Sequence, residues 1–343
     1  MSRLRAALTL LALAFLVASQ GCGDGDDPGP AASAAPAAGA GSVSSSAPRW
    51  RPLEPALLRR TEVGAARIGR FIYVVGGFLP STETTAAVER YDIERDRWRR
   101  IGPMPLAVNH PAVAALDGRL YVYGGYTDSA FGAVTGLLQE YRPGAHTWRR
   151  LPASPTPRAA AALVAAGERL YAVGGVAGGR PLATLESYDP SRRVWRSGLP
   201  SMAVPREHIA AALAGGDVYV LGGRDGGRNL DVVERYDLDR RRWSRAPSLA
   251  FARSGFSATS VGGNVIALGG EELTPSGTTI RPVEILDPGE RRWRRLPGMR
   301  TPRHGLGAAS LGRRVYTLEG GPSPGFAFSD VIEVIRLPRR LLR

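Results

Sequence analysis

Five arginines recur at one fixed distance before a repeated glycine doublet, and they are the residues whose spacing most suggests ligand chemistry. The doublet begins sixteen residues after the position that these arginines occupy. Guanidinium groups bind carboxylates and phosphates through paired hydrogen bonds. If these side chains share one surface, they form a cationic ring that suits an anionic ligand. The six residues at this position are Arg60, Val108, Arg158, Arg206, Arg253 and Arg303.

The two residues that follow each of these positions add further polar and titratable groups. Side chains two positions apart point to the same side of a strand, so the second of the two would accompany the arginine. The first positions hold Thr61, Asn109, Ala159, Glu207, Ser254 and His304, and the second hold Glu62, His110, Ala160, His208, Gly255 and Gly305. The residues that we predict to bind a ligand are Arg60, Asn109, His110, Arg158, Arg206, Glu207, His208, Arg253, Arg303 and His304.

The recurring arginines also have a purely architectural interpretation. Repeating ion pairs often hold a scaffold together, and each repeat carries an acid that could neutralise its arginine. Sequence alone leaves the ligand-binding and architectural roles open. The candidate partners are Glu89, Glu186, Glu234, Glu284 and Glu333.

Histidines raise the question of a metal site. His110, His208 and His304 fall in alternate repeats. His304 stands one position earlier in its repeat than the other two, so its side chain would point to the opposite side of the strand. A tetrahedral zinc site needs ligand nitrogens about 2.1 Å from the metal, which we expect this spread to prevent. We therefore predict no metal site and no cofactor.

The elements that would position these residues are short strands in a sixfold repeat. Apolar runs end in glycine doublets, as in FIYVVGG (71–77), and the first five doublets follow one another at intervals of 47 to 50 residues. The sixth copy, VYTLEGG (315–321), reads as carrying one additional residue, Glu319. Each unit supplies four strand signals, as a propeller blade does. A tyrosine seven residues before a tryptophan marks four copies: Tyr91 and Trp98, Tyr141 and Trp148, Tyr188 and Trp195, Tyr236 and Trp243.

With these marks the sequence resembles the kelch-repeat family over about residues 48–338. The last copy ends at DVIEVIRLP (330–338) without a fourth strand, whereas Trp50 stands in RWRPL (49–53) before the first copy. Ring closure removes exposed sheet edges. We therefore predict an all-β fold, a six-bladed β-propeller closed by the N-terminal strand around Trp50. The segments after the doublets vary most in length and composition, so we expect their face to bind the ligand.

The first 47 residues have the composition of an export signal and a tether. Arg3 and Arg5 precede an apolar stretch that is too short to span a bilayer, and Cys22, the only cysteine, follows it. This segment resembles a bacterial lipoprotein signal, which implies lipidation of Cys22 and export to the outer membrane. The predicted regions are a signal peptide (1–21), a flexible Gly/Ala/Ser/Pro tether (22–47), the propeller (48–338) and a basic tail (339–343).

The formal net charge of +14 comes from 45 arginines with no lysine. Such exclusive use of arginine indicates a coding bias, and we expect no nucleic-acid partner. The first functional hypothesis is a non-catalytic module that binds a protein or glycan. The arginines favour an anionic ligand, and the membrane would be contacted only through the lipid anchor.

The second hypothesis is an enzyme. Some kelch propellers are N-acetylneuraminate epimerases, and Arg206, Glu207 and His208 are of the residue types that such sugar chemistry needs. The copper chemistry of kelch-type galactose oxidases needs a cysteine cross-linked to a tyrosine. It is disfavoured because Cys22 lies outside the repeats.

Overall fold

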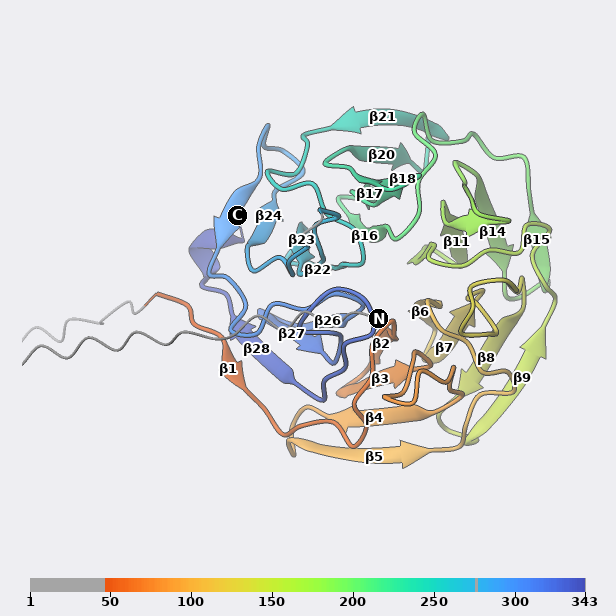
Figure 1. Ribbon diagram of the computed structural model, residues 1–343. Coiled ribbons are helices and arrows are strands. Elements are labelled where there is room, and N and C mark those ends of the chain that lie inside the picture. The colour runs from red at the N-terminus through yellow and green to blue at the C-terminus, as the bar shows by residue number, and fades with distance from the viewer. Residues whose placement is uncertain (1–46, 275–276, 343) are drawn as a thin grey trace, which may run out of the picture. The chain divides into compact units, whose positions relative to one another are not determined.

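The computed structural model describes residues 47–274 and 277–342. These residues form six four-stranded antiparallel sheets arranged as blades around one axis (Figure 1). The predicted six-bladed propeller is therefore confirmed. The signal peptide, Cys22 and nearly all of the tether lie outside the described residues.

Each blade runs from an innermost strand at the axis to an outermost strand at the rim. The innermost strands of blades 1 to 6 are β2 (Gly64–Ile68), β6 (Ala112–Leu116), β10 (Ala162–Ala166), β16 (Ala210–Ala214), β22 (Ser257–Val261) and β26 (Gly307–Leu311). The second strands are β3 (Phe71–Val75), β7 (Arg119–Tyr123), β11 (Arg169–Val173), β17 (Asp217–Leu221), β23 (Asn264–Leu268) and β27 (Arg314–Leu318). The third are β4 (Val88–Asp92), β8 (Leu138–Arg142), β14 (Leu185–Asp189), β20 (Val233–Asp237), β24 (Val283–Leu286) and β28 (Ile332–Arg336). The outermost are β5 (Arg97–Ile101), β9 (Thr147–Leu151), β15 (Val194–Arg196), β21 (Arg242–Ala246), β25 (Arg294–Leu296) and β1 (Arg51–Pro52).

Small additional elements decorate this ring. The loops after β11 and β17 each form a two-residue hairpin: β12 (Val176–Ala177) with β13 (Arg180–Pro181), and β18 (Arg224–Asp225) with β19 (Arg228–Asn229). Part of the predicted basic tail is a short 3₁₀ helix, η1 (Arg339–Leu341). Among the described residues, no helix is long and apolar enough to cross a membrane.

The ring closes where β1 pairs with β28, with Arg51 opposite Val334 (Figure 1). Trp50 is buried beside this junction, and its indole N–H donates to the carbonyl of Pro297 at 2.7 Å. The other five tryptophans make the same bond to a carbonyl that precedes their blade. The N-terminal strand β1 thus completes the last blade, and Trp50 supplies the sixth of six equivalent rim contacts. Those contacts join Trp98 to Glu54, Trp148 to Gly102, Trp195 to Pro152, Trp243 to Pro200 and Trp293 to Pro247.

Packing between neighbouring blades explains the residue types along each strand. After their first residue the second strands are almost entirely apolar, as in RLYVY of β7, because they are buried by blades on both sides. The innermost strands are instead rich in alanine and glycine, as in AVAAL of β6. Space narrows toward the axis, and a Cβ at Gly307 would lie 2.6 Å from the Cβ of Ala65. Large side chains therefore fill the space between blades, and small ones surround the channel.

The glycine doublets connect each blade to the next. The second glycine of blade 1, Gly77, donates its N–H to the carbonyl of Val108 at 2.9 Å, and Gly320 makes the equivalent bond to Arg60. Gly320 therefore corresponds to Gly77, and Glu319 occupies the position of the first glycine, Gly76. The expectation that Glu319 is an additional residue is wrong: it replaces a glycine and keeps the left-handed backbone, with φ of 53°.

Candidate functional site

A pocket of about 380 Å³ opens at one end of the central channel. Its lining comes from the loops after the second strands and from the connections that lead into the innermost strands. It therefore lies on the face where the loops vary most. The charged residues of the pocket lie near the axis, and its aromatic residues come from the loops. We call this cavity the mouth pocket.

At the centre of the floor of the mouth pocket lies a closed ring of six residues, which we call the axial ring: Glu62, His110, Ala160, His208, Gly255 and Gly305. Each lies two positions before the first residue of an innermost strand and has a left-handed backbone, with φ between 50° and 60°. Backbone hydrogen bonds run from one member to the next, as from His110 N–H to the Glu62 carbonyl at 3.0 Å. The last bond, from Val63 N–H to the Gly305 carbonyl, completes the circle at 3.1 Å. Below the axial ring the channel holds a second cavity of about 140 Å³.

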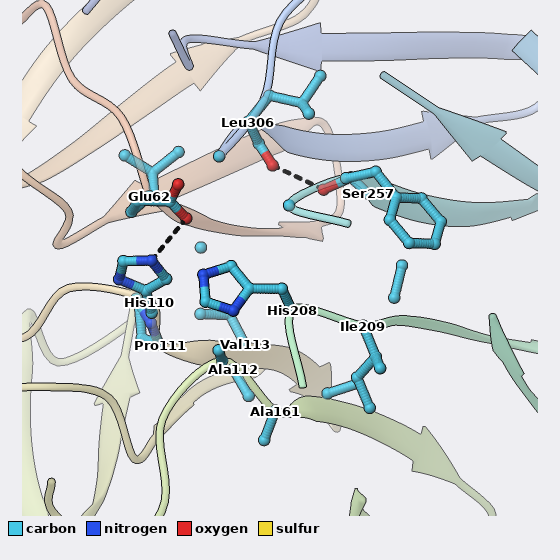
Figure 2. Close-up of a pocket in the computed structure, with 18 of the residues that line it drawn as sticks. Glu62, His110, Pro111, Ala112, Val113, Ala161, His208, Ile209, Ser257 and Leu306 are labelled. Carbon is cyan, nitrogen blue, oxygen red and sulfur yellow. Dashed lines mark hydrogen bonds and ion pairs between the residues drawn. The ribbon is translucent and has the colours of Figure 1, made fainter. Parts of the chain in front are cut away.

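Glu62 is the centre of a charged cluster on this floor. Its carboxylate lies 3.2 Å from His110 Nε2 and 3.1 Å from His304 Nδ1. Figure 2 shows the Glu62 carboxylate and the imidazoles of His110 and His208 pointing toward one another beside the axis. The imidazole centroids of His110 and His208 are 4.8 Å apart. Residues from blades 1, 2, 4 and 6 therefore meet at one point.

A second group of charges adjoins this cluster. The Glu207 carboxylate accepts hydrogen bonds from His208 Nδ1 and from Arg224 Nε. Arg224 Nη2 lies 3.2 Å from His208 Nε2, and Arg224 Nη1 lies 3.6 Å from a carboxylate oxygen of Glu271. The floor thus holds three carboxylates and a single arginine, together with three histidines.

The protonation of these groups follows from burial and from their neighbours. Burial alone would raise the pKa of Glu62, but His110, His304 and His208 together hold it well below its ordinary value. Burial lowers the pKa of His110 to about 3. Burial would also lower the pKa of His304, but its hydrogen bond and charge interaction with Glu62 raise it above the ordinary value. For Glu207, the effect of burial is outweighed by His208 and Arg224, which bring its pKa to about 2. The carboxylates of Glu62 and Glu207 are therefore ionised at neutral pH.

An aromatic wall rises above the charged floor on the side of blades 6, 1 and 2. Phe78 is buried and makes edge-to-face contacts with Phe131 and Phe326, at centroid distances of 5.8 and 5.2 Å. Tyr126 packs against Phe131 at 5.2 Å. Phe131 and Phe326 are 45% and 49% exposed, which is unusual for phenylalanine in a well-packed propeller. The wall therefore offers apolar surface beside a set of charges.

The loop that carries Phe131 is held in one conformation by Asp128. The Asp128 carboxylate accepts the backbone N–H groups of Ala130, Gly132 and Ala133 at 2.8 to 3.1 Å. Phe131 itself has a φ of 59°, a left-handed conformation that is costly for a residue with a Cβ. Strain of this kind is maintained at binding sites when surrounding contacts enforce it.

The five recurring arginines do not line the mouth pocket. All five are 0% exposed, and each forms an ion pair with a glutamate on the third strand of its own blade. Arg253, for example, donates to the carbonyls of Gly269 and Pro282 and to the Glu284 carboxylate. Their donors are used inside the blades, so the expectation that they face a ligand is wrong. The pairs are Arg60 with Glu89, Arg158 with Glu186, Arg206 with Glu234, Arg253 with Glu284 and Arg303 with Glu333.

Blade 2 shows why these pairs are architectural. It has Val108 in place of the arginine and Gln139 in place of the glutamate. Gln139 Oε1 still accepts the N–H of Leu106 at 2.9 Å, as Glu284 accepts the N–H of Ala250 in blade 5. The two positions therefore change together, because a buried carboxylate needs a cation and a buried amide does not.

The remaining predicted residues do gather at the mouth pocket. His110, Glu207, His208 and His304 line it, and Asn109 contacts His110 Nδ1 at 2.7 Å. The expectation that His110 and His208 lie too far apart to share a metal is wrong. The left-handed turns direct both side chains to the axis, and the intervening member of the axial ring, Ala160, is small.

Several lining residues were absent from the predicted set, and half of them share one sequence signal. The residue directly after each glycine doublet lies in the pocket in five blades, because it pairs with the residue that precedes the axial-ring member. The other omissions are the ring member Glu62, its neighbour Thr61, and the loop residues Phe131, Gly325 and Phe326. The five post-doublet residues are Phe78, Tyr126, Val176, Arg224 and Glu271.

Comparison with known proteins agrees with the repeat geometry. The family described as the KLHDC2/KLHL20/DRC7 Kelch-repeats domain matches residues 62–270, which is more than half of the chain. The chain belongs to the kelch-repeat family. The Kelch motif also matches residues 252–300.

Similar kelch proteins occur in animals, viruses and fungi. Kelch-like protein 38 of Mus musculus is 36% identical over 127 residues, which are 37% of this chain and 22% of that protein. Kelch repeat and BTB domain-containing protein 1 of cowpox virus is 30% identical over 161 residues, covering 45% of this chain and 28% of that protein. Kelch-like protein terF of Aspergillus terreus is 36% identical over 126 residues, covering 34% and 28%. The chain thus spans less than a third of the length of these relatives.

A solved structure titled "Structure of YjhT" has the same fold. It superposes with a TM-score of 0.70 at 16% identity and covers 81% of this chain and 95% of that chain. At this level of identity the likeness concerns the kelch propeller architecture alone.

Proposed function

We propose that this kelch propeller is a non-catalytic binding module that receives a segment of a partner protein in the mouth pocket. The observation that carries the proposal is the pair of exposed phenylalanines, Phe131 and Phe326, above a charged floor. Asp128 holds Phe131 in place before any partner arrives, so little conformational entropy is lost on binding. Aromatic anchors of this kind commonly dominate protein interfaces.

The charges of the floor define what the bound segment should carry. The arginines no longer support the prediction of an anionic ligand, because all five guanidinium groups are buried in ion pairs. The accessible floor has three carboxylates, Glu62, Glu207 and Glu271, against Arg224 and the histidines. We therefore propose that the bound segment places an apolar side chain on the aromatic wall and a neutral or cationic group over the floor.

The experiment compares partner capture by matched variants. The wild-type chain, Phe131→Ala/Phe326→Ala and the control Val194→Ala are each used to capture proteins from extracts of the producing organism. Val194 is 56% exposed on β15, away from the mouth pocket. A partner of this pocket should be captured by the wild type and by the control, and lost at least about tenfold with the double variant. Equal capture by all three would refute the proposed site. Selective binding of glycans instead of proteins would show that the ligand of the mouth pocket is a carbohydrate.

The enzymatic alternative has less support. Arg206 belonged to the proposed sugar-binding constellation, but it is buried in an ion pair with Glu234. The comparisons give no support to an N-acetylneuraminate epimerase. Mutarotation of sialic acid followed by NMR tests it directly, because a rate above that of buffer alone would favour catalysis.

We also propose that Cys22 is lipidated and attaches the propeller to a bacterial outer membrane. The support is the sequence pattern of residues 1–22, which lie outside the described part of the chain. Cys22→Ser should move the protein from the membrane fraction to the soluble fraction and abolish fatty-acid labelling. Unchanged fractionation and labelling would overturn the anchor.

A further inference from the structure

Three potential metal ligands converge on the propeller axis from separate blades. One ligand atom from each of Glu62, His110 and His208 can be chosen so that all lie within 4.8 Å of one another. His110 Nε2 is 3.2 Å from Glu62 Oε2. Two imidazoles and one carboxylate make a donor set that suits zinc and other first-row divalent ions.

The hydrogen bonds of both histidines engage Nδ1 and leave Nε2 as the nitrogen that can bind an ion. Asn109 Nδ2 donates to Thr84 Oγ1 and to the Asp128 carbonyl, so Asn109 Oδ1 faces His110 Nδ1 at 2.7 Å. Because this amide oxygen can only accept, Nδ1 of His110 carries a proton, and in the neutral imidazole Nε2 is then bare. The bare Nε2 then faces the Glu62 carboxylate, and two acceptors at this distance need a cation between them.

His208 has the same kind of Nδ1 contact two blades further round. Its Nδ1 contacts the Glu207 carboxylate, which can only accept, so the proton again lies on Nδ1. Its Nε2 accepts from Arg224 Nη2 at 3.2 Å. A metal-ligating imidazole usually donates its other ring N–H to an acceptor, which fixes the orientation of the ring and is called its outer support here. Here the residue directly before each histidine, Asn109 or Glu207, supplies it.

The backbone holds the three ligands in place before an ion arrives. All three belong to the axial ring, whose members are joined by backbone hydrogen bonds and share a left-handed φ. Cavities lie on both sides, so an ion can enter from the mouth pocket. Rigid first ligands with outer support are what a metal site requires.

We propose that Glu62, His110 and His208 bind one divalent first-row transition-metal ion, with Zn²⁺ as the reference ion, at the axis of the propeller. The inference goes beyond the proposed function, because it concerns an ion and does not depend on the partner. Three protein ligands leave a coordination position for a donor from the mouth pocket. Arg224 competes with the ion, since it occupies His208 Nε2 in the metal-free arrangement.

The test is metal binding by the full chain carrying Cys22→Ser, which removes the one thiol, after treatment with a chelator. Titration calorimetry with ZnCl₂ should give one ion per chain, and CoCl₂ should give visible absorption bands of imidazole-bound cobalt. His110→Ala and His208→Ala should each weaken binding on the order of 100-fold, and Asn109→Leu about tenfold through the loss of outer support. Arg224→Gln should strengthen binding because it frees His208 Nε2.

His146→Ala is the matched control, because His146 lies in the turn between β8 and β9 beside Tyr141, away from the axial ring. It should bind zinc as the parent does. Thermal unfolding of each metal-free variant reports on folding, and the parent protein is decisive by itself. No zinc binding by the folded parent would overturn the proposal and show that a proton on His110 Nε2 bridges to Glu62 instead. Undiminished binding by folded His110→Ala, or unchanged or weaker binding by folded Arg224→Gln, would overturn this ligand set.

Discussion

Arg60 donates hydrogen bonds from Nε and Nη2 to the two carboxylate oxygens of Glu319, each at 2.8 Å, and this buried pair joins the last blade to the first. Arg60 also pairs with Glu89 at 3.1 Å, so one guanidinium faces two carboxylates. Burial raises the pKa of Glu319 to about 7; Arg60 opposes this effect and Glu89 adds to it. Glu319 stands where five other blades have the first glycine of the doublet.

This arrangement predicts a pH-dependent stability that Glu319→Gly removes. The folded-state pKa of Glu319, about 7, lies above the ordinary value of 4.5. Protonation of Glu319 therefore contributes its full stabilisation below pH 4.5, and this contribution is lost as the pH rises through 7. Between pH 4.5 and about pH 8, the wild type should lose on the order of 3 kcal/mol of unfolding free energy relative to the variant. Denaturant unfolding at several pH values measures this difference.

Glycine itself suits the left-handed backbone at this position, and Arg60 keeps Glu89 as its partner in the variant. The variant should therefore fold, which makes the comparison interpretable. Parallel stability curves for the two proteins would show that Glu319 does not titrate in this range.

A second prediction concerns the buried ion pairs inside the blades. Arg253→Val leaves the carboxylate of Glu284 buried without a cation and should cost about 3–5 kcal/mol of stability. Adding Glu284→Gln reproduces the residues of blade 2, Val108 and Gln139, and should restore part of that loss. Urea unfolding of the two single variants and the double variant gives the coupling energy. Additive effects would contradict the architectural role of the pair.

Ring closure supplies a third prediction. Trp50 is buried in the cluster between blades 5 and 6 and donates to the Pro297 carbonyl. Trp50→Ala should lower the unfolding free energy by about 3–5 kcal/mol through lost packing, whereas Trp50→Phe should cost less because it retains most of the apolar contact. Thermal and denaturant unfolding report both. A loss below about 1 kcal/mol for the alanine variant would mean that the first strand does not hold the ring closed.

The fold could be predicted because its marks are local and repeated. Tyrosine, tryptophan and the glycine doublet keep their spacing in most blades, and the missing fourth strand of the last copy identified Trp50 as its completion. The arginine pairing was also partly visible, since Val108 and Gln139 replace both partners in the same blade.

The site was harder to predict because its side chains do not follow the alternation of side chains along an extended strand. Alternation assumes extended backbone, whereas His110 and His208 have φ near 50° and turn toward the axis. Arginines placed on the channel side by that assumption instead point into the blades. Contacts such as that of His304 with Glu62 join residues 242 positions apart, and no local spacing encodes them.

The final prediction tests whether the axial ring controls the site. Gly305→Ala places a Cβ within 2.6 Å of Glu62 N, Glu62 Oε1 and Thr61 Oγ1, in addition to the cost of a left-handed backbone at φ 56°. Gly69→Ala is the matched control, because Gly69 has φ 57° and no atom within 4 Å of the added Cβ. The control should lose about 1 kcal/mol of stability.

Gly305→Ala should lose clearly more stability than the control and should displace the Glu62 carboxylate. Denaturant unfolding measures the first effect, and zinc titration of the folded variant measures the second. Equal stability losses for the two variants would mean that the axial ring adapts to a methyl group. In that case the position of Glu62 would be set by its histidine partners and not by the backbone circle.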